Sequence, residues 1–170
     1  MQRLFPASAK FGQLKGTIKI IREHRGTISI SSLAKKAHQN IDQLLPVVDA
    51  CVALDIAKTS NGSISLTPYG KKLNISNTKK LVTDKIVLVE PFKSTVQILK
   101  TQGDLRTDKL SRLLFDRGIA MYRDNDINTG VLRELLLRWG VRCGLLRHNA
   151  RLDEWSLGTV ARATGTKKYA

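Results

Sequence analysis

The sequence has few of the features that mark a secreted or membrane-spanning protein. Its 170 residues include only two cysteines, Cys51 and Cys143, each in an apolar stretch, so we expect reduced core thiols and no structural disulfide. No run of about 18 apolar residues is present, which excludes a membrane-spanning helix. The first ten residues lack the apolar run of a secretory signal. These absences predict a protein that stays in the cytoplasm.

Acidic and aromatic residues are also scarce. Against 29 Lys and Arg there are 14 Asp and Glu, a net charge of +15, of which +9 lies in residues 1–88 and +6 in residues 89–170. An excess of this size favours a polyanionic partner, nucleic acid first and an anionic membrane surface second, with general surface basicity as the plainer explanation. Aromatic residues, at 5%, are too few to stack single-stranded bases. The 42% of hydrophobic residues suffices for a packed core.

Patterns for catalysis are missing as well. The three histidines, His24, His38 and His148, fall on separate predicted elements, with no cysteine or second histidine at ligand spacing. Asp124 and Asp126 lie in a stretch without the glycine and glutamate of a calcium loop, and helix capping explains them better. We therefore expect no enzymatic activity, no metal or other cofactor, no small-molecule substrate and no membrane insertion.

The hydrophobic pattern predicts a winged helix-turn-helix in the first half. Apolar residues at helical spacing alternate with short β-branched segments, and an Asn-Gly pair between two of them predicts a hairpin. The predicted elements are, in order, a helix over 12–25, a strand over 27–30, helices over 31–40 and 40–54, and two strands over 56–59 and 63–67.

The same order returns after Pro91, which predicts a tandem. The fold class is therefore mainly α with small β-wings (α+β), as two winged helix-turn-helix units joined by a linking helix. The predicted parts are a leader (1–11), a first unit (12–74), a linking helix (75–90), a second unit (91–157) and a basic C-terminal tail (158–170). Alignment of the two copies pairs Leu45 with Leu132, Val48 with Leu135, Val52 with Trp139, Ile56 with Leu145, and Leu66 with Leu157.

The third helix of the first copy is predicted to bury Leu45, Val48 and Val52. Its outward face then carries Gln43, Pro46, Val47 and Ala50 and has no lysine or arginine. A helix that reads the major groove needs donors for phosphates and base edges, so this face suits a protein contact better.

Two segments carry a resemblance to a known family. They are 42–50, Asp-Gln-Leu-Leu-Pro-Val-Val-Asp-Ala, and 65–73, Ser-Leu-Thr-Pro-Tyr-Gly-Lys-Lys-Leu. In this order they resemble the AAA-associated C-terminal domain, which is typically fused behind the ATPase of nitrate, sulfonate or taurine ABC transporters. The resemblance covers roughly residues 12–157 and implies a tandem winged-helix fold. The chain departs from that family in its strong basicity, and its Gly12–Thr17 segment is too short for a Walker loop.

Basic residues suited to phosphate contacts occur on several predicted elements. They lie on the second helix, around the linking helix, on the third helix and wing of the second copy, and in the tail. The candidates are Lys35, Lys36, Lys71, Lys72, Lys79, Lys80, Arg133, Arg138, Arg142, Arg147, His148, Arg151, Arg162, Lys167 and Lys168.

The sequence thus predicts a non-enzymatic nucleic-acid-binding protein with mainly phosphate-backbone contacts. It would act as a transcription-regulator-like protein on DNA or in association with ribosomal RNA. The alternative is a regulatory module that docks on a separately encoded ABC transporter ATPase. In that case Val47, Leu137 and Val141 are the expected contact residues, for the ATPase, another protein or a second copy of the chain.

Overall fold

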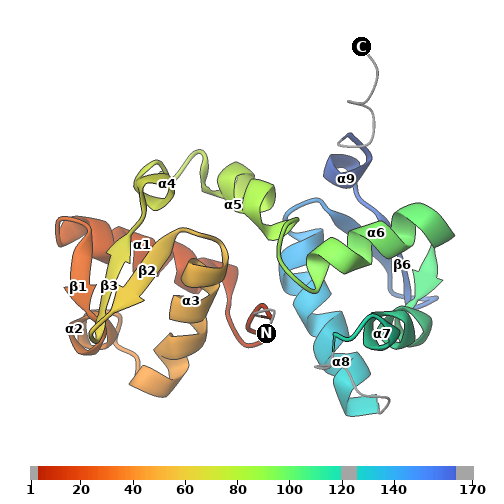
Figure 1. Ribbon diagram of the computed structural model, residues 1–170, viewed down its shortest axis with the longest axis horizontal. Helices are drawn as coiled ribbons and strands as arrows, with labels where there is room; N and C mark the ends of the chain where they lie inside the picture. Colours follow the sequence, from red (N-terminus) through yellow and green to blue (C-terminus); the bar gives the residue numbers. More distant parts are fainter. Residues whose placement is uncertain (1–3, 120–125, 164–170) are drawn as a thin grey trace. The chain divides into compact units, whose positions relative to one another are not determined.

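Two compact units make up the protein. The computed structural model describes residues 4–119 and 126–163, and these group into one unit from Phe5 to Lys85 and another from Ile86 onward (Figure 1). Each unit packs three main helices against a small three-stranded antiparallel sheet. This confirms the mainly α fold with small β-wings and the tandem of winged-helix units.

The first unit follows the predicted order of elements. Ser29 and Asn40 cap the second and third helices, because their side-chain oxygens accept hydrogen bonds from the backbone N–H groups of Ser32 and Gln43. The sheet has the order β1-β3-β2. The elements are α1 (Phe11–Glu23), β1 (Thr27–Ser29), α2 (Ile30–Lys36), α3 (Ile41–Ala53), β2 (Ala57–Ser60), β3 (Ser63–Leu66), α4 (Pro68–Lys71) and α5 (Thr78–Ile86).

The second unit repeats this arrangement, with the sheet order β4-β6-β5. Its third helix continues as a π-helical turn, η1, and its first strand is only two residues long. The elements are α6 (Phe92–Gln102), β4 (Leu105–Arg106), α7 (Thr107–Asp116), α8 (Asp126–Leu135), η1 (Leu136–Val141), β5 (Leu146–Asn149), β6 (Glu154–Leu157) and α9 (Thr159–Ala163).

Both predicted terminal segments contribute to the units. Residues 5–11, expected as a leader, lie within the first unit, where Phe5 and Ala9 are fully buried. Residues 159–163, expected as part of a tail, form α9 and bury Ala161. These segments are shorter than the window over which hydrophobic periodicity can be recognised, so it gave no signal for them.

The predicted orientation of α3 is correct only in part. Val48 is buried as predicted, but Leu45 is 40% exposed, and Val47 and Ala50, expected to face outward, are buried beside Leu44 and Cys51. Apolar residues occupy most sides of this helix, so several stripes at helical spacing fit its sequence. The capping of α3 by Asn40 and its packing in the unit select the stripe one residue earlier than the predicted one.

Backbone hydrogen bonds join each wing to the helix before it. In the first unit, Ile56 N–H donates to the Cys51 carbonyl at 2.8 Å, and the Ile56 carbonyl accepts from Thr67 N–H at 2.9 Å. In the second, Leu145 N–H donates to the Gly140 carbonyl at 3.0 Å, and the Leu145 carbonyl accepts from Gly158 N–H at 2.7 Å. Ile56 and Leu145 are thus equivalent, as the alignment predicts.

The alignment is one or two residues wrong within the third helices. Because Cys51 is equivalent to Gly140, Trp139 corresponds to Ala50 and not to Val52. The i→i−5 hydrogen bonds of a π-helical turn take up one additional residue, so the phase changes along η1. Upstream of η1, the buried Leu132 corresponds to the buried Leu44.

A glycine is required where α4 crosses the chain that leaves α3. A Cβ on Gly70 would lie 1.9 Å from the carbonyl oxygen of Ile56, far inside van der Waals contact. We expect Gly70→Ala to destabilise the first unit by about 3 kcal/mol, because backbone atoms must move to admit the methyl group. Denaturant unfolding followed by circular dichroism measures this, and both tryptophans, which lie in the second unit, provide an internal reference.

Gly16→Ala is the matched control within the same unit. Gly16 lies inside α1 with no atom within 4 Å of its Cβ position, so alanine is expected to stabilise the helix by about 0.5–1 kcal/mol. Equal effects of the two substitutions would contradict the close approach at Gly70.

Candidate nucleic-acid interface

The first sheet presents hydroxyl groups on the side away from the core. Strand pairing sets Thr27, Ser65 and Lys58 in one row across the sheet, and the Thr27 hydroxyl donates to Ser65 Oγ at 3.0 Å. The next row on this side consists of Ser29, Ser63 and Ser60, whereas the intervening Ile28 and Ile64 are buried. We call these six outward residues the wing face: Thr27, Ser29, Lys58, Ser60, Ser63 and Ser65.

Two more cations border the wing face. Arg25 is exposed directly before β1, and the Lys71 side chain lies next to Gly26, where a Cβ would be 3.8 Å from Lys71 Cε. Lys71 is among the phosphate-contact residues predicted from the sequence, whereas Arg25 and Lys58 are not. The alternation of Ser63-Ile64-Ser65-Leu66 was the available signal, since it puts both serines on one side of a strand.

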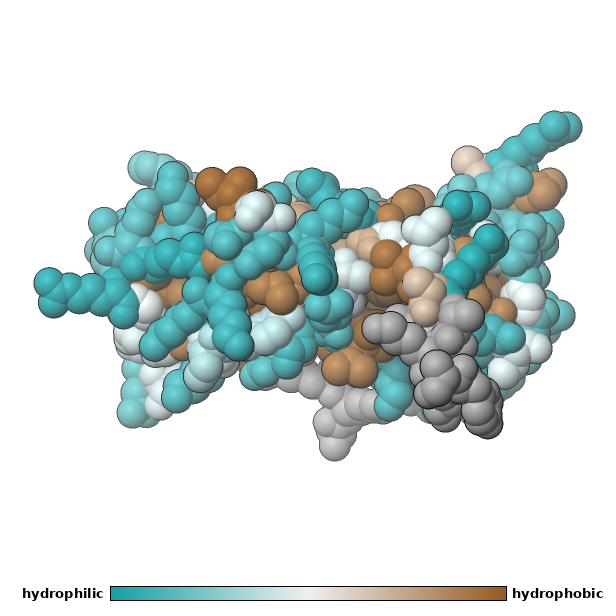
Figure 2. Space-filling model, turned by 90° about the horizontal axis from the view of Figure 1, so that it is seen from above, coloured by the Kyte–Doolittle hydropathy of each residue, from teal (hydrophilic) through white to brown (hydrophobic). Residues whose placement is uncertain are grey.

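The lysine pairs of the first unit that the sequence predicts to contact phosphates are all exposed. None of their side chains has an acidic partner within 4 Å among residues 4–119 and 126–163. Figure 2 shows long hydrophilic side chains projecting from this unit, with apolar surface between them. The pairs are Lys35 and Lys36 at the end of α2, Lys71 and Lys72 at the end of α4, and Lys79 and Lys80 in α5.

Two nominated residues of the second unit are held by one carboxylate. Asp153 accepts hydrogen bonds from Arg133 through Nε at 2.9 Å and Nη2 at 2.7 Å, from His148 Nε2 at 2.9 Å and from the Thr107 hydroxyl at 2.8 Å. Trp155 Nε1 donates to the same Thr107 oxygen at 2.8 Å, and its ring lies 4.3 Å from that of His148. We call this arrangement the Asp153 network.

The Asp153 network changes the charge available at the surface. The hydrogen bonds from Arg133 above all, with those from His148 and Thr107, hold the pKa of Asp153 well below its usual range. The same contact with Asp153 raises the pKa of Arg133. Arg133 and His148 therefore contribute to the packing of the second unit, and Nε and Nη2 of Arg133 and Nε2 of His148 already donate to Asp153.

The remaining nominated residues of the second unit are distributed differently. Arg138 donates to Glu134 at 2.6 Å, one helical turn away. Arg147 and Arg151 are exposed on the second hairpin, with no ionic partner in the described part of the chain. Arg142 and Arg162 are exposed and take part in further interactions. Lys167 and Lys168 lie outside the described residues.

Of the three predicted protein-contact residues, one is buried and two are partly exposed. Val47 is fully buried, so it cannot contribute to an exposed contact surface, and this follows from the corrected orientation of α3. Leu137 is 39% exposed and Val141 is half-buried. On α3 it is Ile41, at 47%, and Leu45 that offer apolar surface instead.

The described residues contain no cluster of three or more His, Cys, Asp or Glu side chains placed to hold a metal ion. Burial raises the pKa of the Cys51 thiol to about 12, so it stays protonated and is a poor nucleophile at neutral pH. Over 4–119 and 126–163, none of the helices has both the length and the hydropathy needed to cross a bilayer.

Comparison with family models supplies the assignment. The model of the C-terminal AAA-associated domain matches residues 31–148, which is more than half of the chain. The chain belongs to the C-terminal AAA-associated domain family. This confirms the resemblance of the 42–50 and 65–73 segments. Searches of curated proteins and of solved structures returned no significant match.

The Asp153 network makes the stability of the second unit depend on pH. Because the folded state lowers the pKa of Asp153, its contribution is present above the ordinary carboxyl pKa of about 3.9 and is lost as the pH falls below it. We expect Asp153→Asn to cost about 1–3 kcal/mol at pH 7 and to flatten the acid dependence of unfolding.

Tryptophan fluorescence measures this in urea titrations between about pH 7 and pH 3, since Trp139 and Trp155 both lie in the second unit. Asparagine tolerates the positive φ of 49° at this position. Asp104→Asn, at an exposed carboxylate, is the control. If both variants follow the parent pH profile, the Asp153 network does not contribute as described.

Proposed function

We propose that this protein is a non-enzymatic nucleic-acid-binding protein that contacts the phosphate backbone mainly through its first unit. It acts in the cytoplasm, where its two cysteines remain free thiols. A transcription-regulator-like role on DNA and an association with ribosomal RNA are the two forms of this proposal.

The unpaired cations of the first unit are the observation that carries it. Between Phe5 and Lys85 there are 13 Lys and Arg against five Asp and Glu, a net charge of +8. Lys85 bonds Asp55 at 2.9 Å, and Lys19 lies 4.0 Å from Glu23 with both side chains well exposed. Most cations of this unit therefore keep their donors available for phosphate oxygens.

The hydroxyls of Ser60, Ser63 and Ser65 on the wing face add neutral donors to these charges, whereas those of Thr27 and Ser29 donate to Ser65 and Ser32. Serine and threonine hydroxyls donate to phosphate oxygens, and such contacts fix a nucleic acid in position without reading its sequence. Lys58 lies within the wing face, and Arg25 and Lys71 border it. Hydroxyls and cations thus combine on one exposed surface, as a backbone-binding wing requires.

The third helix of the first unit supports backbone contacts over base reading. No Lys or Arg occurs in α3, and its exposed residues are Ile41, Asp42, Gln43 and Leu45, of which only Gln43 supplies a side-chain donor. Such a helix would bring an acidic side chain and apolar surface to the major groove, where arginine, lysine and amide donors are needed. We therefore expect affinity with little sequence preference.

A double variant at the wing face tests the proposal. We expect Lys58→Gln/Lys71→Gln to weaken binding to a short duplex and to make the slope of log K against log salt shallower by about 2, because each lost phosphate contact releases about one counterion fewer. Fluorescence anisotropy of the full chain with duplex DNA and hairpin RNA, between about 50 and 200 mM salt, measures both.

The matched control is Lys93→Gln/Lys100→Gln, which removes the same charge from exposed positions on α6 of the second unit. It is expected to leave the slope unchanged. An equal loss with both variants would show that only net charge matters, and a parent chain that binds neither nucleic acid would refute the function itself.

The alternative, docking on a separately encoded ABC transporter ATPase, has one observation in its favour. Ile41 and Leu45 expose apolar surface on α3 where no cation competes with it. Under this alternative Leu45→Asp is expected to abolish capture of the purified ATPase, whereas Lys58→Gln/Lys71→Gln has no effect. Under the nucleic-acid proposal, Lys58→Gln/Lys71→Gln weakens nucleic-acid binding in the anisotropy assay, and Leu45→Asp has no effect on it.

A further inference from the structure

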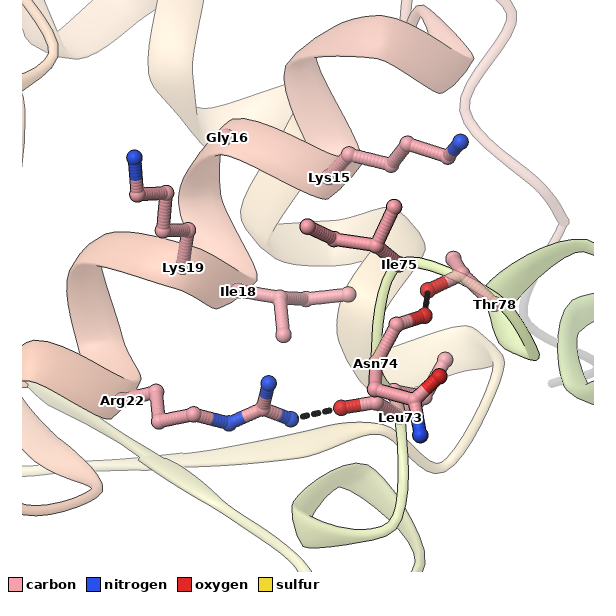
Figure 3. Close-up of a pocket in the computed structure, with 9 residues that line it drawn as sticks. All are labelled: Lys15, Gly16, Ile18, Lys19, Arg22, Leu73, Asn74, Ile75 and Thr78. Carbon is pink, nitrogen blue, oxygen red and sulfur yellow. Dashed lines mark hydrogen bonds between the residues drawn. The ribbon is translucent and has the colours of Figure 1, made fainter.

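A groove lies between α1 and the segment that follows α4. It has a volume of about 300 Å³ and is lined from α1 on one side and from residues 73–78 on the other (Figure 3). This volume is at the lower end of the range for small-molecule sites. All of its lining residues belong to the first unit.

Apolar side chains form the inner surface of the groove. Ile18 and Leu73 are almost completely buried beneath it, and Ile75 borders it while remaining 96% exposed. Gly16 has no side chain and no atom within 4 Å of its Cβ position, so the α1 backbone is open to a ligand there. A ligand seated here would cover apolar surface that water now contacts, chiefly that of Ile75.

Cations line the α1 side of the groove. Lys15, Lys19 and Arg22 follow one another at i, i+4 and i+7 on one side of the helix. In Figure 3 the Arg22 guanidinium donates to the Leu73 carbonyl, which ties the two walls together, whereas the lysine side chains extend away from that contact. No acidic residue lines the groove, and the one carboxylate near these cations, Glu23, lies 4.0 Å from Lys19 with both side chains well exposed, so the rim keeps a positive charge that favours an anion.

Hydrogen bonds hold the opposite wall in one conformation. Asn74 Oδ1 accepts from the backbone N–H groups of Ser76 and Asn77, at 3.0 Å each, and from the Ser76 hydroxyl at 2.7 Å. Asn77 in turn accepts from Asn74 N–H at 2.7 Å and donates from its side chain to the Lys72 carbonyl at 2.9 Å. Ile75 is therefore held exposed by an ordered turn, which lowers the entropy cost of binding against it.

We propose that this groove binds a small organic anion with a compact apolar body, such as a medium-chain carboxylate. The apolar part would cover Ile18, Leu73 and Ile75, and the anionic group would face Lys15 and Lys19. The phosphate groups of a nucleic acid supply negative charge, but they have no apolar part that could pack against Ile18 and Ile75. The site is therefore distinct from the wing face, and the inference does not depend on the proposed function.

Three probes separate charge from apolar contact. Octanoate combines both, octanol has only the chain, and inorganic phosphate has only the charge. We expect saturable octanoate binding to the full chain, followed by amide NMR shifts at Gly16, Ile75 and their neighbours, and affinities at least about ten-fold lower for the other two probes. Phosphate or octanol binding as tightly as octanoate, or octanoate shifts spread over the whole protein, would overturn the proposal.

Two variants test the residues named. Lys15→Gln/Lys19→Gln is expected to weaken octanoate binding about three- to ten-fold and to leave octanol unchanged. Ile75→Ser is expected to weaken the binding of both octanoate and octanol. This substitution should not disturb folding, because the Ile75 side chain is 96% exposed. The matched controls, Lys35→Gln/Lys36→Gln and Leu152→Ser, change equivalent exposed residues elsewhere and should bind octanoate like the parent chain. Octanoate affinity that is the same in all four variants would refute the site.

Discussion

The backbone junction at Ile56 determines how the first wing can face its surroundings. Its N–H closes the end of α3, and its carbonyl receives the N–H of Thr67 after the hairpin has returned. Gly70 then fits against the same carbonyl, so α4 closes over the junction. Because both ends of the hairpin are fixed, the face of the sheet on which each side chain lies is also fixed, and it alternates along the strand. Ile64 and Leu66 enter the core, and Ser63 and Ser65 face outward. The wing face is thus a consequence of this junction. The second unit has the same junction at Leu145, whose carbonyl accepts from Gly158 N–H, and a Cβ on Gly158 would lie 2.2 Å from the neighbouring Gly144 carbonyl oxygen.

The two units diverge in how they use charge on this shared frame. The first hairpin turns at Asn61-Gly62 and contains no acidic residue, so Lys58 keeps its charge at the surface. The second hairpin is two residues longer, and the additional length carries Asp153. That carboxylate binds Arg133 and His148 and brings Thr107 and Trp155 into the same network. The positive charge and hydrogen-bond donors that Arg133 and His148 direct to Asp153 stabilise the second unit and are not offered to a ligand.

Much of the fold could be predicted from the sequence, and the failures have specific causes. The Asn61-Gly62 pair and the helical spacing of apolar residues placed the elements correctly within a few residues. The face of α3 could not be predicted because its sequence is apolar on most sides, and only packing selects among the stripes. The π-helical turn at η1 leaves no composition signal, so the alignment there was wrong. Among the candidate site residues, Arg133 and His148 looked like other surface cations, since their partner Asp153 is distant from Arg133 in sequence.

Net charge alone is a weak argument for binding, and the arrangement of the charges is stronger. At physiological salt the Debye length is about 8 Å, so cations farther apart than that act nearly independently on a ligand. The total of +15 therefore matters less than which side chains are neighbours and lack acidic partners. On the wing face, strand pairing places Lys58 in the Thr27 row and the Lys71 side chain lies next to Gly26, and neither lysine has an acidic partner within 4 Å among the described residues. In the groove at α1, Lys15 has no acidic partner within 4 Å in the described part of the chain, Lys19 lies 4.0 Å from Glu23, and both border apolar surface and not hydroxyls. One unit thus presents two basic surfaces of different chemistry, and a phosphate backbone and an amphiphilic anion would each suit only one of them.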